Sequence, residues 1–245
     1  MSLVGQAAFL VSFPVAASAI GAGIAAVRPP GPRVVSAIQH FAAGVVIAAL
    51  AGEVLPDLRG EGNLGWAVSG FVCGVTLVLG LAAYGRLIDG RERDSESRAT
   101  VLPLGLLVAV AIDLLIDGLL VGLGARLGST QALILTIALT LEILFLSLSL
   151  VTELTDRGLS AVRATAVCSC LGLVTAVGAI GAAAFLAGVG ASVLAFVLAC
   201  GAAALLYLAV EELIVEAHDQ TETTFLSAML FAGFLCIYVL SELAA

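Results

Sequence analysis

Long apolar stretches are the feature that most constrains how this chain folds. Eight segments carry almost no charge over roughly 20 residues, the length that an α-helix needs to cross the hydrocarbon core of a bilayer. Of the 245 residues, 61% are hydrophobic and 11% are charged, whereas a soluble domain has about 45–50% and about 25%. The sequence therefore predicts an all-α, polytopic membrane protein. The predicted spans are approximately 7–27, 37–56, 65–84, 101–124, 131–153, 164–187, 192–214 and 225–243.

These spans and their short connections occupy the sequence, so residues 1–245 are predicted to form a single transmembrane domain. The first span has no basic segment before it and no clear cleavage signal after it, so we expect a retained helix rather than a signal peptide. The stretch GRLIDGRERDSESRAT is rich in charge and poor in hydrophobic residues. It predicts a loop at 86–100 between the third and fourth spans.

The distribution of arginine predicts the orientation of the chain. The sequence has ten arginines and no lysine, and eight of the ten fall in the connections that follow the first, third and fifth spans. Only Arg59 and Arg126 fall on the other side. By the positive-inside rule, we expect both termini to be extracellular and the 86–100 loop to be cytoplasmic. The membrane is expected to be the cytoplasmic (plasma) membrane. The net charge of −8 argues against a nucleic-acid partner, which requires a basic face.

Three acidic residues interrupt the apolar runs near the middle of the fourth and fifth spans: Asp113, Asp117 and Glu142. One acid at the bilayer centre costs about 2.5–3.5 kcal/mol, so three cost on the order of 8–10 kcal/mol, comparable to the stability of a whole domain. Asp113 and Asp117 share a helix face, and Glu142 shares a stripe with Ser149 and Glu153. Two such stripes on consecutive antiparallel helices can face each other. Because no arginine falls within the spans, protons or a cation would neutralise them.

Simpler explanations stay open for single polar residues. A lone buried acid is often protonated and hydrogen-bonded to a backbone carbonyl, although three acids at one depth favour a shared site. His40, early in the second span, is expected to be a hydrogen-bonded structural residue rather than a ligand. His218 is either a solvated loop histidine or part of a cytoplasmic exit.

An internal echo relates the second and seventh spans. EVLPD (residues 53–57) closes the second span and ELIVE (residues 212–216) closes the seventh, and each contains two carboxylates one helical turn apart. The predicted topology makes these two spans antiparallel, and antiparallel copies of one pattern are typical of the inverted repeats of transporters. The sequence therefore suggests a 3+2+3 inverted-repeat organisation.

The flanking helices carry a resemblance to a known family. FAAGVVIAALAGEVLPDL resembles the second helix of the ZIP (Zrt-, Irt-like) family of divalent-metal transporters, which ends in a His-Leu-Leu-Pro-Glu-like motif, and Glu53 stands at its histidine. AAALLYLAVEELIVEAHD resembles the seventh helix, ending His-Glu-Ile-Ile-Pro-Glu-like. Glu211 stands at that histidine and Glu212 matches the glutamate. The order of the motifs, the topology and the long third connection extend the resemblance over essentially the whole chain.

The fourth and fifth spans depart from the family's ligand motifs. DLLIDG occupies the place of His-Asn-x-x-Asp-Gly, so that Asp113 replaces the histidine, Leu114 replaces the asparagine and Asp117 matches. LEILF occupies the place of His-Glu-x-Pro-His/Glu, where Glu142 matches and the other two ligand positions are apolar. The family has two adjacent metal sites between these helices, whereas this chain keeps ligands for roughly one.

The resemblance implies a transporter of divalent cations, with zinc, manganese or iron as the cargo, no covalent cofactor and no enzymatic activity. Metal would bind at mid-membrane to Asp113, Asp117 and Glu142. Carboxylates nearer the two surfaces would gather and release it. These residues are Glu53 and Asp57 outside, and Glu211, Glu212, Glu216 and His218 inside.

Two other functions compete with this prediction. The chain could be a ZIP-like protein that has lost the usual metal site and conducts protons or serves a structural or sensing role. A more distant alternative is an intramembrane aspartyl-type hydrolase that uses Asp117 with Glu142, whose two carboxylates would share one proton. The sequence leaves a homodimer open.

Overall fold

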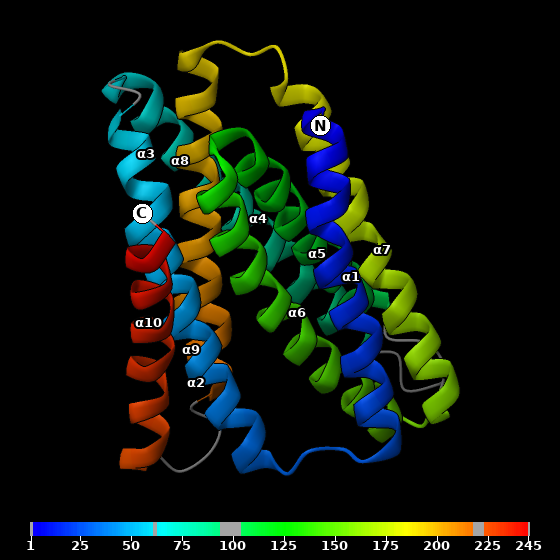
Figure 1. Ribbon diagram of the computed structural model, residues 1–245. Coiled ribbons are helices and arrows are strands. Elements are labelled where there is room, and N and C mark those ends of the chain that lie inside the picture. Colours follow the sequence, from blue (N-terminus) through cyan, green and yellow to red (C-terminus); the bar gives the residue numbers. More distant parts are fainter. Residues whose placement is uncertain (1, 61–62, 94–103, 218–222, 245) are drawn as a thin grey trace.

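The computed structural model describes residues 2–60, 63–93, 104–217 and 223–244 (Figure 1), and every regular element in these ranges is a helix. Eight of the described helices are long and apolar enough to cross a membrane, which confirms the prediction of an all-α, multi-pass membrane protein. In chain order the elements are α1 (Leu3–Val27), α2 (Pro32–Ala49) with η1 (Leu50–Val54) and α3 (Leu55–Gly60), α4 (Leu64–Arg93), α5 (Leu104–Leu127), α6 (Ser129–Asp156), α7 (Ala161–Leu186), α8 (Ala191–Tyr207) with η2 (Leu208–Leu213) and α9 (Ile214–Ala217), and α10 (Thr224–Ala244).

The third helix is longer than the sequence suggested. Helix α4 continues to Arg93, so the first part of the predicted 86–100 loop is helical and that prediction was wrong there. Charge does not end a helix by itself: arginine, leucine and glutamate are good helix formers, and no proline interrupts residues 64–93. Residues 94–100 lie outside the described part of the chain.

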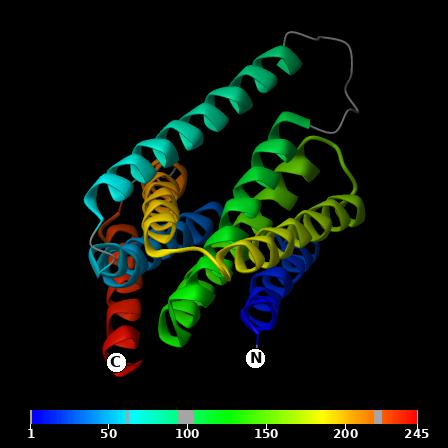
Figure 2. The ribbon, with the colours of Figure 1, turned by 90° about the horizontal axis from the view of Figure 1, so that it is seen from above.

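The helices form two sets, which Figure 2 shows side by side from above. In the first set, α5 packs on α7, and α1 packs on both α6 and α7. In the second set, α2 packs on α10 and α4 packs on α8.

Glycines allow these close approaches. A Cβ added at Gly118 of α5 would overlap the backbone oxygen of Thr175 on α7, and one added at Gly44 of α2 would overlap that of Leu230 on α10. Small residues let helices approach closely in lipid, where burial of apolar surface gives little drive for association.

Apolar clusters hold α5 and α6 on the side of the first set that faces the second set. One cluster joins the sets and includes Val46 of α2, Leu139 of α6 and Leu205 of α8. A second lies inside the first set and includes Leu114 of α5 and Ile143 of α6. Helices α5 and α6 therefore have one side in the first set and another at the boundary with the second.

Two helices contain a π turn, a local widening that is rare and often found at functional sites. The turns are η1, with sequence LAGEV, and η2, with sequence LAVEEL. Both begin Leu-Ala-x-Glu, which aligns Glu53 with Glu211. The echo of EVLPD and ELIVE aligns Glu53 with Glu212 instead, whereas the family resemblance had already placed Glu53 and Glu211 at corresponding positions.

Candidate metal centre

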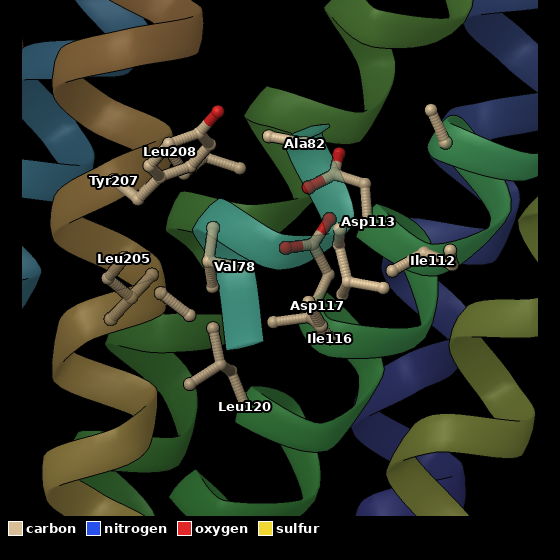
Figure 3. Close-up of a pocket in the computed structure, with 13 residues that line it drawn as sticks. Val78, Ala82, Ile112, Asp113, Ile116, Asp117, Leu120, Leu205, Tyr207 and Leu208 are labelled. Atoms are coloured by element: carbon tan, nitrogen blue, oxygen red, sulfur yellow. The ribbon is translucent and has the colours of Figure 1, made fainter. Parts of the chain in front are cut away.

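Three carboxylates converge between α5 and α6. One oxygen of each of Asp113, Asp117 and Glu142 lies within 4.8 Å of the other two. Asp117 and Glu142 are 1% and 2% exposed, and Asp113 is half-buried. Figure 3 shows the side chains of Asp113 and Asp117 lying together on one side of α5. The facing acidic stripes that the sequence predicted are therefore present.

Helix periodicity explains why these side chains meet while their neighbours do not. Residues four apart lie one above the other on a helix, so Asp113 and Asp117 point to the same side of α5. Leu114 and Ile143, each adjacent to one of the acids, turn into the apolar cluster of the first set. The carboxylates are consequently held between packed apolar residues of regular helices.

A cavity of about 320 Å³, lined by both apolar and polar side chains, adjoins the carboxylates. Glu142, Ser149 and Glu153 line it together, which confirms the stripe predicted on the fifth span. At its far end Glu153 is 44% exposed and accepts a hydrogen bond of 2.6 Å from Arg157. The cavity thus extends from the buried cluster to the end of α6 that carries arginine. The other polar residues in its lining are Asp113, Gln39 of α2 and Glu211 of η2.

A smaller cavity of about 70 Å³ lies on the other side of α5, against the second set (Figure 3). Asp113 and Asp117 line it together with Val78 of α4 and Tyr207 of α8. Most of its other lining residues are apolar. Asp113 therefore borders both cavities, whereas Asp117 borders only the smaller one.

Basic side chains are absent from the described lining of both cavities. The ion pair between Glu153 and Arg157 lies at the rim, with both side chains nearly half exposed. The electrostatic character of the site is therefore set by carboxylates, which are hard oxygen ligands suited to divalent cations.

The predicted outer carboxylates do not join the cluster. Glu53 is 5% exposed, and its Oε1 accepts a hydrogen bond of 2.6 Å from the Oγ of Ser241 on α10. Asp57 lies on α3 and is partly buried. Neither residue belongs to the group that Asp113, Asp117 and Glu142 form.

The predicted inner residues have different outcomes. Glu211 is exposed and lines the larger cavity. Glu212 and Glu216 lie on η2 and α9, but their side chains are outside the described structure. His218 falls in the segment 218–222, which is outside the described residues.

The second span contributes one polar residue that the sequence analysis missed. Gln39 is 5% exposed and lines the cavity between the acids and Glu211. A signal was available, because Ser36, Gln39 and His40 are polar residues spaced three to four apart in an apolar span. His40 is buried, with its Nδ1 2.8 Å from the carbonyl oxygen of Ser36, which confirms the expectation that it is hydrogen-bonded within the fold.

Leu114 and Phe145, the apolar residues at positions where the ZIP motifs have ligands, lie in different surroundings. Leu114 is 3% exposed and belongs to the apolar cluster of the first set, so it faces away from the carboxylates. Phe145 lines the larger cavity, where the family motif would supply a ligand. Among the described residues, one group of three acidic side chains is close enough together to hold a metal ion.

No protein-family model matches the chain, and no curated protein is significantly similar to it. The chemistry of the site itself is therefore the basis for assigning a function.

Proposed function

We propose that this protein is a ZIP-like transporter, not an enzyme, that moves divalent cations across the cytoplasmic membrane. Asp113, Asp117 and Glu142 bind the cation at mid-membrane. The observation that carries the proposal is the approach of these three carboxylates to within 4.8 Å inside an apolar helical bundle. Burying acids in a membrane is expensive and typically serves an ion or proton pathway.

The transporter is organised as a 3+2+3 inverted repeat, in which α5 and α6 lie between two copies of three spans. The helix pairs support this organisation. The second span of one copy packs on the third span of the other: α2 packs on α10, and its counterpart α8 packs on α4. Likewise α6 packs on α1 as α5 packs on α7. The two π turns fall in corresponding spans. The arginine distribution supports extracellular termini.

Cations cross by movement of one helix set against the other around the carboxylate site. The larger cavity supports an inner route, because Ser149, Glu153 and Glu211 line it between the cluster and the arginine-bearing end of α6. Further carboxylates and a histidine extend the route at both surfaces. These are Glu53 and Asp57 outside, and Glu212, Glu216 and His218 inside.

The cargo is zinc, manganese or iron as the divalent ion. Carboxylate oxygens suit Mn²⁺ better than imidazole or thiolate would, although the general affinity order still favours Zn²⁺ over Mn²⁺. The described ligand set contains only carboxylates. We therefore expect a site that is less selective for zinc than one containing histidine.

Proton conduction is the second candidate, favoured by Leu114 and Phe145. Both are apolar residues at positions where the resembled family has ligands, and Leu114 faces an apolar cluster. A site with fewer metal ligands can still hold protons on its carboxylates. The two functions differ in whether a divalent cation binds the folded protein.

Thermal unfolding of the purified protein at increasing Mn²⁺, Zn²⁺ or Fe²⁺ concentration separates these functions. A ligand that binds only the folded state stabilises it by about 2.7 kcal/mol at 100 times its Kd. We expect each ion to raise the melting temperature of the wild type. The control variant Asp156→Asn, which changes an exposed acid on the helix that carries Glu142, should respond in the same way. We expect no rise in Glu142→Gln. A wild type that no divalent ion stabilises would refute the metal site and leave the proton pathway.

A further inference from the structure

The two π turns have the same start but different surroundings. Glu53 is the fourth residue of Leu-Ala-Gly-Glu in η1, and Glu211 is the fourth residue of Leu-Ala-Val-Glu in η2. Glu53 is 5% exposed and accepts the 2.6 Å hydrogen bond from Ser241. Glu211 is exposed and lines the cavity that reaches Asp113. Equivalent carboxylates are thus closed off in one copy and open in the other.

The hydrogen bond to Glu53 joins the two copies, because Glu53 lies on η1, which continues α2, and Ser241 lies on α10. Its counterpart would join Glu211 to α4, and the sequence of α4 does not provide for it. Gly233 of α10 packs against the backbone of α2, and Gly74 of α4 packs against the backbone of α8. Ser241 lies eight residues after Gly233 (233 to 241), and Ala82 lies eight residues after Gly74 (74 to 82). Alanine has no hydroxyl group to donate, so the position equivalent to Ser241 cannot hold Glu211 in the same way.

We propose that the Ser241–Glu53 hydrogen bond is a latch that keeps the outer side of the protein closed. It thereby favours the state in which the carboxylate cluster is reached through the larger cavity, beside Glu211. The proposal rests on the function proposed above. In a transporter built from inverted repeats, the two access states exchange the conformations of the two copies. A contact made at only one of the two symmetry-related positions therefore biases the equilibrium between the two access states. Ser241 acts as a positioning residue through Glu53.

The size of the bias follows from the chemistry of the contact. A net hydrogen bond changes an equilibrium by roughly twofold to tenfold. Breaking the bond releases Glu53 to bind a cation on the outer side, the role that Glu211 has in the inner cavity. Figure 1 shows α10 running beside α2, so the latch lies within the second helix set.

Cysteine accessibility in detergent tests the latch, because both sides of the protein are then exposed to reagent. One reporter is Ser149→Cys in the inner cavity. The other is Ala49→Cys, which is buried and lies one turn before Glu53. Each is made in a background where the other cysteines are alanine and the buried Cys168 is retained.

Ser241→Ala is expected to slow maleimide labelling at Ser149→Cys and to speed it at Ala49→Cys, with the ratio of the two rates changing by up to roughly tenfold. Ser241→Thr restores a hydroxyl and should return both rates to the wild-type values. Ser227→Ala, which removes an exposed hydroxyl on the same helix, should leave both rates unchanged.

Opposite changes at the two reporters distinguish a shift between states from general loosening, which would speed labelling at both. Unchanged rates in Ser241→Ala, or an increase at both reporters, would overturn the latch. Failure of the metal site is a separate result: it appears as a wild type that divalent ions do not stabilise, whereas the labelling ratio is measured without metal.

Discussion

Glu142 and Glu53 are both buried glutamates in membrane-spanning helices, at 2% and 5% exposure, but their surroundings differ. Glu142 lies in a regular α-helix, with a carboxylate oxygen within 4.8 Å of those of Asp113 and Asp117. Glu53 lies on a π turn and accepts a hydrogen bond from Ser241. Three carboxylates at this separation repel one another unless a cation or protons neutralise them. A lone carboxylate needs only a hydrogen-bond donor such as a hydroxyl group. Burial is common to both glutamates; the convergence of carboxylates is what distinguishes Glu142 from Glu53.

The first prediction tests the orientation of the helices in the membrane, and with it the assignment of Glu53 to the outer side. Helix α7 has Ser160 before one end and Gly188 after the other, and both are exposed. In intact cells, an impermeant maleimide should label Gly188→Cys and leave Ser160→Cys unlabelled, because the arginine distribution predicts that the Ser160 turn is cytoplasmic. The effect is all or none. In inverted vesicles the pattern should reverse, and labelling of both ends from one side would break the topology and the assignment of Glu53 to the outer side.

The second prediction contrasts the two glutamates directly. Glu142→Gln should abolish stabilisation by Mn²⁺ or Zn²⁺, because it removes a ligand from a shared site, while Glu53→Gln should retain it. At 100 times the Kd, the expected loss is about 2.7 kcal/mol, measured by thermal unfolding with and without metal.

A double variant sharpens this contrast. Adding Asp117→Asn to Glu142→Gln should cause little further loss of metal-dependent stabilisation, since residues that bind one ion are not additive. Independent, additive losses would instead indicate separate hydrogen bonds, as at Glu53, and would erase the difference between the two regions.

The third prediction concerns the packing behind the cluster. Gly118 follows Asp117, and a Cβ at this position would overlap the backbone of α7 at Thr175. Gly118→Ala should destabilise the protein by about 1–3 kcal/mol through overpacking, measured as a lower melting temperature in detergent. Gly23→Ala is the matched control: nothing lies within 4 Å of a Cβ there, so the gain in helix propensity should leave stability unchanged or higher. Equal effects at both glycines would show that the close approach of α5 to α7 does not restrain the site.

The sequence was sufficient to predict the helices because hydrophobicity over about 20 residues depends only on local composition. It was also sufficient to predict that Asp113, Asp117 and Glu142 face one another, because helical periodicity fixes the faces and consecutive spans are neighbours. The continuation of α4 to Arg93 was missed, since charge density suggested a loop where helix propensity remained high.

The surroundings of Glu53 could not be predicted, because its partner Ser241 is 188 residues away in the chain. Only packing of α10 on α2 reveals that contact. Gln39 was missed for a related reason: its spacing from Ser36 indicates a polar helix face, but only the tertiary structure shows that it reaches the cavity of Glu142. Local pattern thus predicts the shared site better than the isolated hydrogen bond.

The last prediction concerns metal selectivity at the edge of the cluster. Asp113 borders both cavities and is half-buried, so an imidazole has room there. Leu114 is a poorer choice for substitution, because it faces the apolar cluster and an asparagine there would bury an amide. Because imidazole favours zinc, Asp113→His should raise the ratio of Zn²⁺ to Mn²⁺ affinity on the order of tenfold, equal to about 1.4 kcal/mol. Competition binding measures this ratio, with Asp113→Asn as the control that removes the charge without adding an imidazole. A ratio unchanged by histidine would mean that Asp113 does not touch the ion, and the cluster would then resemble Glu53, with its acids held by hydrogen bonds rather than by a shared cation.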